Sequence, residues 1–331
     1  MRTLVLLGAA IGVLAAPAAK AAEFTFYDIP SSLGTVATGV NDSGQVAGYY
    51  QTEVQDPNPR SVNRGFTSTV ATPGVVATVH APGYDATQLF SINNAGVSAA
   101  TLVPILAAGP PPTTGGTVGA TYNGVFSPPI FPPQAVDGPL KNAFAQGVNT
   151  AGTVVGYYRD TASTTTFGFT FAGGVYTNPI SNGGQPTFLT GINGAGTAVG
   201  YYQGGGTTHG ITYNGLFSAD IDVPGATDGT FATGLSDGGE VVGYFIDGSG
   251  THGFVLVDGI FTTIDVPGAL GVTQILGINN RHQVAGYYVN DEGKQIGFVA
   301  YVPEPGTMAL FATGAFFLPF ARRARARRSA A

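Results

Sequence analysis

One phrase of about twelve residues returns six times along this chain, and no other feature limits the fold as strongly. It reads GVNTAGTVVGYY at Gly147 and GINGAGTAVGYY at Gly191, and the other copies begin at Gly39, Ser91, Gly234 and Gly277. The last four copies are separated by 44, 43 and 43 residues, whereas the first two intervals contain insertions at 51–63 and 104–116. Such a period indicates repeated units that pack against their neighbours.

Each unit is predicted to form four short strands. In the fifth unit these are Thr230–Ser236, Glu240–Ile246, Thr251–Val257 and Ile260–Val266. They are rich in β-branched and aromatic residues, which suit a pleated surface, and Asp258-Gly259 between the last two is a strong hairpin signal. Four strands in about 43 residues is the size of one β-propeller blade.

The two ends of the repeat region complement each other. The sixth unit supplies three strands and then ends at Val302, while Glu23–Ser32 matches the fourth-strand phrase at Ile260 without three strands before it. Pairing this N-terminal segment with the third strand of the sixth unit would remove exposed sheet edges. The sequence therefore predicts an all-β, six-bladed propeller closed by Glu23–Ser32, with both ends of the domain side by side.

The composition excludes several functions. The chain has no cysteine, which rules out disulfides, thiolate metal sites and cysteine nucleophiles. Between Ala22 and Val302 it carries six basic and eighteen acidic residues, a net charge of −12. Because such a body repels phosphate backbones, the sequence argues against a nucleic-acid partner.

The N-terminus is typical of a secretory signal peptide. Met1-Arg2 precedes an apolar stretch from Leu4 to Ala16, and small residues surround Lys20. We therefore expect residues 1–21 to be removed on export and residues 22–302 to form the propeller outside the cytoplasm.

The C-terminus contains a Pro-Glu-Pro triplet, an apolar run and a basic end. Pro303, Glu304 and Pro305 precede the run, and the arginines that follow it are Arg322, Arg323, Arg325, Arg327 and Arg328. Thr307–Ala321 is shorter than the roughly 20 residues that a membrane-crossing helix needs. The positive-inside rule keeps the arginines cytoplasmic, so the segment by itself is a weak anchor.

This order of features resembles the PEP-CTERM sorting signal of Gram-negative bacteria that make extracellular polysaccharide. The resemblance implies that residues 303–331 hold the exported protein transiently at the inner membrane until an exosortase processes it near Pro303-Glu304-Pro305. The secretion machinery is then a further partner, and extracellular polysaccharide or other matrix components are expected at the outer surface or in the matrix. The phrases Gly-x-Asn, Gly-Tyr-Tyr and His-Gly-Phe also resemble the HAF family of extracellular repeats, which implies little about activity.

Five units share a glycine in the turn that follows their first strand. These structural turn glycines are Gly44, Gly96, Gly152, Gly196 and Gly239. Glycine at this place predicts a turn closed by a left-handed residue. The sixth unit has His282 instead, which we interpret as a strained or exposed turn residue rather than a metal ligand.

Recurring polar residues are interpreted as structural. Asp28, Asp222 and Asp265 share one fourth-strand position, which favours turn formation over the acid pair of a glycosidase. His209 and His252 occupy equivalent places in adjacent units and show no nearby carboxylate pattern, so no catalytic residue, metal or cofactor is expected.

Calcium is an alternative that the ligand spacing does not support. The turns at Asn41–Gly44, Asp247–Gly250 and Asn290–Gly293 lack the alternating acidic residues of a calcium loop.

The repeated tyrosine pairs favour core packing over sugar stacking, because adjacent strand residues face opposite sides of a sheet. The pairs are Tyr49-Tyr50, Tyr157-Tyr158, Tyr201-Tyr202 and Tyr287-Tyr288. Binding sites are expected on the end loops, including the two insertions.

The leading hypothesis is a non-catalytic surface or matrix protein. The alternatives are an extracellular hydrolase or lyase acting on polysaccharide, and a calcium- or glycan-dependent adhesin.

Overall fold

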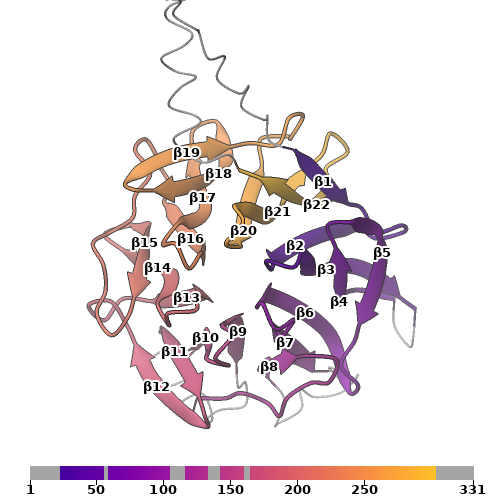
Figure 1. Ribbon diagram of the computed structural model, residues 1–331, viewed down its shortest axis with the longest axis horizontal. Coiled ribbons are helices and arrows are strands. Elements are labelled where there is room, and N and C mark those ends of the chain that lie inside the picture. The colour runs from indigo at the N-terminus through magenta and orange to yellow at the C-terminus, as the bar shows by residue number, and fades with distance from the viewer. Residues whose placement is uncertain (1–22, 56–58, 105–115, 133–141, 160–164, 303–331) are drawn as a thin grey trace, which may run out of the picture. The chain divides into compact units, whose positions relative to one another are not determined.

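The computed structural model describes residues 23–55, 59–104, 116–132, 142–159 and 165–302. The predicted signal peptide, the sorting segment and most of the second insertion lie outside these residues. Within the compact unit Phe24–Val302, six antiparallel sheets surround a central axis (Figure 1). This is the six-bladed β-propeller predicted from the repeats. In the described part of the chain, no helix has the length and apolar character to cross a membrane.

The blades are numbered from the order of their innermost strands. Blade one contains β2 (Gly34–Val40), β3 (Gln45–Val54), β4 (Arg60–Thr69) and β5 (Thr72–Val79), and blade two contains β6 (Tyr84–Ile92), β7 (Ser98–Pro104) and β8 (Val118–Tyr122). Blade three contains β9 (Ala143–Val148), β10 (Val154–Arg159), β11 (Thr166–Ala172) and β12 (Val175–Ile180), and blade four contains β13 (Thr187–Ile192), β14 (Ala198–Gly204) and β15 (Thr207–Tyr213). Blade five contains β16 (Thr230–Leu235), β17 (Val241–Asp247), β18 (Gly250–Val257) and β19 (Ile260–Ile264). Blade six contains β20 (Thr273–Ile278), β21 (Gln283–Val289), β22 (Gln295–Tyr301) and β1 (Phe24–Tyr27).

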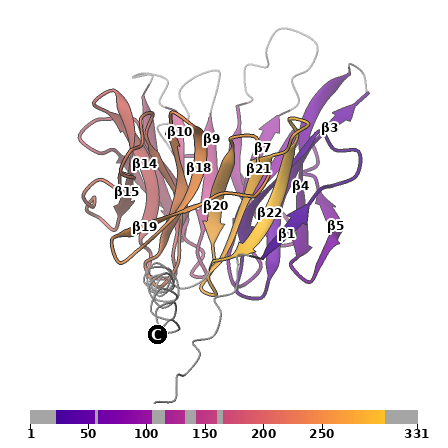
Figure 2. The same cartoon turned by 90° about the horizontal axis from the view of Figure 1, so that it is seen from above.

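The ring closes as predicted, because β1 is the outer strand of blade six. Phe24 pairs with Ala300 and Tyr27 pairs with Gly297 in an antiparallel ladder. Figure 2 shows β1 beside β22 in the edge-on view. The Tyr27 side chain is buried, and its hydroxyl donates a hydrogen bond to the carbonyl oxygen of Thr69 in blade one. The first strand therefore joins the last blade to the first.

The fourth strand is reduced to isolated bridges in blades two and four. In blade two, Gly119 pairs with Ile130 across a segment that contains Pro128 and Pro129, which have no N–H to donate to a ladder. In blade four, Gly210 pairs with Ile221. The chain between these two residues is as long as the chain between Gly253 and Ile264 of blade five, but its turn, Asn214-Gly215, lies one residue earlier than Asp258-Gly259 does.

Glycines of the repeat phrase allow the backbone to approach closely. A Cβ atom on Gly200 would lie 1.9 Å from the carbonyl oxygen of Phe188 in the same blade. A Cβ atom on Gly191 would lie 2.9 Å from the carbonyl oxygen of Thr233 in the next blade. Both distances are too short for a side chain. The glycines of Gly-x-Asn and Gly-Tyr-Tyr are therefore required by packing within and between blades.

Aromatic rings connect the faces of blades three, four and five. Tyr157 stacks on Phe144 at 4.8 Å within blade three and contacts Phe188 of blade four edge-on at 5.1 Å. The same alternation continues through Tyr201, Phe231 and Tyr244. Burial raises the pKa of Tyr157 to about 12. The first tyrosine of each of these pairs is thus a packing residue between blades.

Candidate binding site at the mouth of the central channel

The asparagine of Gly-x-Asn closes the first turn of its own blade. The Asn41 Oδ1 atom accepts hydrogen bonds from the backbone N–H groups of Ser43 and Gln45, at 3.1 and 2.9 Å. Asn279 accepts two equivalent bonds in blade six, at 2.9 Å each. An asparagine side chain suits this turn because its oxygen reaches backbone donors two and four residues further on.

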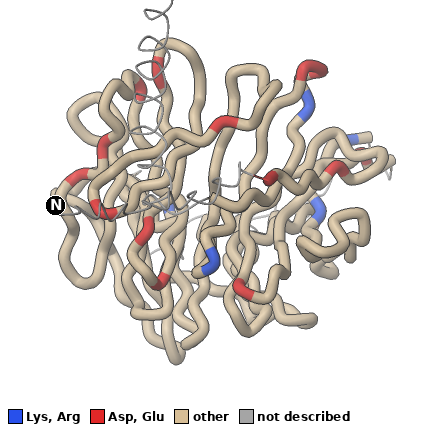
Figure 3. The backbone as a smooth tube through the Cα atoms, turned by 45° about the horizontal axis from the view of Figure 1, so that its top comes forward, with Lys and Arg blue, Asp and Glu red and all other residues tan. Residues whose placement is uncertain are grey.

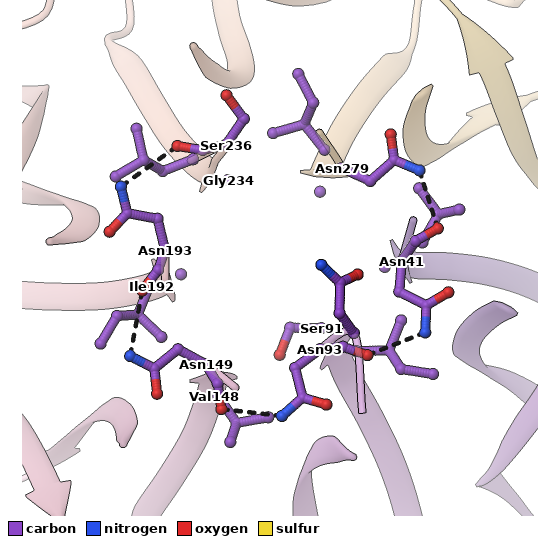
Figure 4. A pocket seen from close by; sticks show the side chains of 18 of the residues that line it. Asn41, Ser91, Asn93, Val148, Asn149, Ile192, Asn193, Gly234, Ser236 and Asn279 are labelled. Carbon is purple, nitrogen blue, oxygen red and sulfur yellow. Dashed lines mark hydrogen bonds between the residues drawn. The ribbon is translucent and has the colours of Figure 1, made fainter. Parts of the chain in front are cut away.

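The amide nitrogen of each asparagine reaches the next blade. The bonds run from Asn41 to the Asn93 carbonyl, and onward through Asn149 and Asn193 to the Ser236 carbonyl, at 2.9 to 3.3 Å. Asn279 closes the opposite side by donating to the Asn41 carbonyl at 2.9 Å. Figure 4 shows these five bonds around the channel. We call the five asparagines, together with Ser236, the asparagine ring.

Ser236 interrupts this ring, and a second pair of side chains replaces the missing link. The Ser236 hydroxyl is 3.1 Å from Glu240 Oε2, and Glu240 Oε1 is 2.7 Å from His282 Nδ1 in blade six. His282 has a φ of 57° and is half-buried. It is a left-handed turn residue as expected, but it also bonds blade six to blade five, which the sequence did not indicate.

A second tier of polar groups lies one residue beyond the ring. The Asn280 amide donates to Asp42 Oδ2 at 3.0 Å and to Asp237 Oδ2 at 2.9 Å. Asp42 Oδ1 accepts the backbone N–H of Asn280, and Asp237 Oδ1 accepts the backbone N–H of Gly194 at 2.6 Å. Asn94 also donates to Asp42, at 2.6 Å. Two carboxylates therefore flank one amide, and both accept bonds from several fixed donors.

The ring and the second tier surround a cavity of about 180 Å³ to which all six blades contribute. Ser91 lies in its lining, at the place where five blades have glycine. Its φ is 34°, and its Oγ atom makes no hydrogen bond within the protein. Since a buried hydroxyl ordinarily has a partner, Ser91 is a candidate contact for a bound polar molecule.

The channel contains carboxylates but no triad geometry among the described residues. A Ser-His-acid triad requires the imidazole between the hydroxyl and the carboxylate. Here Glu240 lies between Ser236 and His282, so the carboxylate and not the imidazole holds the central place. The mouth offers carboxylate, amide and hydroxyl groups, which are the groups that bind polyols and carbohydrates through hydrogen bonds.

The structural turn glycines have the left-handed backbone conformation. Their φ angles range from 75° at Gly44 to 88° at Gly239.

The residues of the sorting motif, Pro303, Glu304 and Pro305, and the terminal arginines lie outside the described residues. In the acidic turns, Asp247 and Asn290 accept bonds from their own backbone, so these oxygens already serve turn closure.

The repeated aspartates have a different role from the one predicted. Asp222 bonds to His209 at 3.0 Å, Asp265 to His252 at 2.9 Å, and Asp28 to Lys294 at 2.6 Å. Asp222 and Asp265 lie opposite their histidines in the third and fourth strands, whereas Asp28 follows Tyr27, the partner of Gly297, and reaches Lys294 diagonally. All three are therefore cross-strand partners and not turn formers. The expectation that His209 and His252 lack nearby carboxylates was therefore wrong. The shared interval of 13 residues between each histidine and its aspartate was the available signal.

Acidic residues are distributed over the propeller, as Figure 3 shows, and basic ones are few.

Within residues 302–328, the chain matches the PEP-CTERM protein-sorting motif. This motif implies export by a Gram-negative exosortase system with a C-terminal membrane anchor. No curated protein matches the chain in sequence.

Solved structures with a similar fold have low sequence identity to this chain. A protein of unknown function from Dyadobacter fermentans is 11% identical, with a TM-score of 0.54, and the match covers 85% of this chain and 98% of that one. The α-L-arabinanase of Penicillium chrysogenum, complexed with arabinobiose, is 13% identical with a TM-score of 0.49, covering 83% and 94%. The Trypanosoma rangeli sialidase is 10% identical with a TM-score of 0.49, covering 90% of this chain and 62% of the sialidase. At 11% identity, the likeness to the first protein shows the fold alone.

Proposed function

We propose that this protein is a non-catalytic component of the cell surface or extracellular matrix, whose propeller binds polysaccharide at the mouth of its central channel. The sorting motif supports an exported location, and the resemblance of the repeats to HAF repeats agrees with it. An exosortase processes the tail near Pro303-Glu304-Pro305, after which the propeller associates with exopolysaccharide.

The hydrogen bonding of Asp42 and Asp237 carries the proposal. A glycosidase needs one carboxyl group that donates a proton and a second that acts as nucleophile or base. Here both carboxylates accept bonds from backbone N–H groups, and both hold the same Asn280 amide. The pair therefore acts as a bridge between blades one, five and six, and presents fixed acceptors and amide groups to a ligand.

A polysaccharide hydrolase or lyase is the second candidate. One observation favours it, since two carboxylates flank a single amide inside a cavity, close enough to act on one bond. The two candidates differ in what happens to the polysaccharide. Binding leaves the chain length unchanged, whereas cleavage produces new reducing or unsaturated ends.

The test incubates the purified protein with the exopolysaccharide of its own host. We expect the protein to sediment with the polysaccharide without changing its chain length. Asp42→Asn combined with Asp237→Asn should reduce this association at least tenfold, while Asp258→Asn, in the turn between β18 and β19, should leave it unchanged. Release of new ends that is lost in the double variant would establish the enzyme instead.

The sorting part is tested separately. Replacing Pro303, Glu304 and Pro305 by alanine should leave the protein unprocessed at the inner membrane, detectable by mass spectrometry and cell fractionation. Normal mass and location in this variant would contradict processing at the triplet.

A further inference from the structure

Blade four brings one histidine and two aspartates together on its outer half. His209 lies on β15, and Asp222 is directly opposite because Gly210 pairs with Ile221. Asp220 precedes Asp222 by two residues, so both carboxylates share one face of the sheet. One ligand atom from each of the three side chains lies within 4.8 Å of the others.

The atoms face one another across a small gap. His209 Nδ1 is 3.0 Å from each oxygen of Asp222 and 3.9 Å from Asp220 Oδ2. Metal–ligand bonds of about 2.0–2.2 Å place neighbouring ligand atoms about 3.0–3.4 Å apart. The cluster therefore needs only a small rotation of Asp220 to surround one cation. The side chains are 19% exposed for His209 and 43% and 49% for the two aspartates, so an ion can reach them from solvent.

Tyr202 orients the more distant carboxylate. Its hydroxyl donates to Asp220 Oδ1 at 3.0 Å, and its ring stacks on the His209 imidazole at a centroid distance of 5.1 Å. Such outer partners fix the orientation of ligating carboxylates.

Blade five contains the same histidine–aspartate pair in a different arrangement. His252 Nδ1 bonds to Asp265 at 2.9 Å, but Asp247 lies 3.4 Å from the other ring nitrogen. The two carboxylates are on opposite edges of the imidazole and cannot share one ion with it. Burial alone would lower the pKa of His252, but the bonds and charges of these aspartates outweigh burial and raise it.

The differences between the two blades occur together in the sequence. Where blade four has Asp220 and Tyr202, blade five has Thr263 and Phe245. Blade five therefore lacks both the second carboxylate on that face and the hydroxyl that holds it. The spacing from the histidine to these positions is the same in both blades, so the difference between them is one of residue type.

We propose that His209 Nδ1, Asp220 Oδ2 and the Asp222 carboxylate bind one divalent first-row transition metal ion, with water completing its coordination. An imidazole with two carboxylates suits Zn²⁺ or Mn²⁺ better than Ca²⁺ or Mg²⁺, which prefer oxygen ligands alone. Binding requires the neutral imidazole with its remaining proton on Nε2. The acidic body favours accumulation of cations near the site. This site is independent of the proposed polysaccharide site.

The test uses the full-length protein, purified without a histidine tag and stripped with chelator. Titration calorimetry with Zn²⁺ should give one site per chain, and elemental analysis after dialysis should give the same ratio. Asp220→Asn keeps the size of the side chain and a bond to Tyr202 but removes the charge, and it should weaken binding at least tenfold. His209→Ala should have the same effect.

His252→Ala in blade five is the matched control and should bind Zn²⁺ like the wild type. Zn²⁺ should also raise the melting temperature of the wild type and of His252→Ala, but not of Asp220→Asn, because a ligand stabilises only a fold that binds it. The proposal is overturned if the wild type binds no more Zn²⁺ than His209→Ala, or if His252→Ala loses as much binding as the blade-four variants.

Discussion

Blade two and blade five are both copies of the same repeat, but blade five keeps the residues of the repeated phrase and blade two departs from them. In blade five, Gly234 and Gly243 let β16 approach β17 and the neighbouring blade, and Tyr244 stacks on Phe231 at 4.7 Å. In blade two, Ser91, Ala100 and Thr101 occupy the corresponding positions. Ser91 has a φ of 34°, although the pairing register shifts there just as it does beside Gly234 in blade five.

The difference shows what the repeat phrase specifies. Blade two still forms its three-stranded sheet, so the phrase is not needed for strand formation. Blade two keeps Asn93 in the asparagine ring but lacks the glycine and tyrosine packing: Ser91 and Ser98 have buried hydroxyls without partners, and Thr101 ends the aromatic series. The glycines and tyrosines of the phrase therefore serve mainly to fit one blade to the next.

Removing β1 should have the largest effect, because it takes a whole strand from blade six, whereas the variants below change single residues within a blade. A chain that lacks Glu23–Ser32 loses the buried Tyr27 and exposes the edge of β22. Loss of buried Tyr27 together with the ladder between β1 and β22 should cost more than about 5 kcal/mol, close to the whole stability of a typical domain. Urea unfolding followed by circular dichroism measures this. An unchanged unfolding curve would contradict closure by β1.

The next largest effect is expected for Gly243→Ala in blade five. The new Cβ atom would lie 1.9 Å from the carbonyl oxygen of Phe231, so the backbone must move, at a cost of about 3 kcal/mol. The reverse change in blade two, Ala100→Gly, removes only one buried methyl group and should cost about 1 kcal/mol. Equal losses in the two variants would show that blade two has the same close approach as blade five.

The architecture could be predicted from the sequence because it depends on the interval between repeats and on the number of strands in each unit. The strands of blade five end within two residues of their predicted limits, and the missing strand of blade six identified its N-terminal partner. These inferences need only local alternation and a fixed interval.

The channel mouth could not be predicted in the same way. The asparagine ring depends on contacts between residues 43 to 56 positions apart, or 238 at the closure, and the phrase alone does not reveal the partner of each amide. The bond between Glu240 and His282 lies beside Ser236, where the other five blades have asparagine. Asp220 lies near His209 because an aspartate stands where blade five has Thr263, and the repeat pattern does not specify which residue occupies this position.

Gly234 of blade five and Ser91 of blade two occupy the same position of the repeat, so exchanging glycine and serine there tests the difference between the two blades directly. Gly234→Ser would place a Cβ atom 2.9 Å from Val242 and 3.0 Å from Gly277, which should destabilise blade five by about 2 kcal/mol. Ser91→Gly should stabilise blade two by about 1 kcal/mol, since glycine accepts a positive φ and no unpaired hydroxyl remains. Thermal unfolding compares both variants with the wild type. A loss of stability in Ser91→Gly would mean that the hydroxyl has a partner that stabilises the fold.

The smallest effect concerns the asparagine ring, where Ser236 already lacks the bond to the next blade. Asn193→Ala removes a turn bond to Thr197 and a bond to the Ser236 carbonyl, and should cost about 1–2 kcal/mol. Ser236→Ala loses only contacts with Glu240 inside its own turn and should cost less, about 0.5–1 kcal/mol. Because the bonds between blades hold the innermost strands together, amide hydrogen exchange in β13 and β16 should increase in Asn193→Ala. If exchange changes equally in both variants, the asparagine ring contributes through its turns and not through contacts between blades.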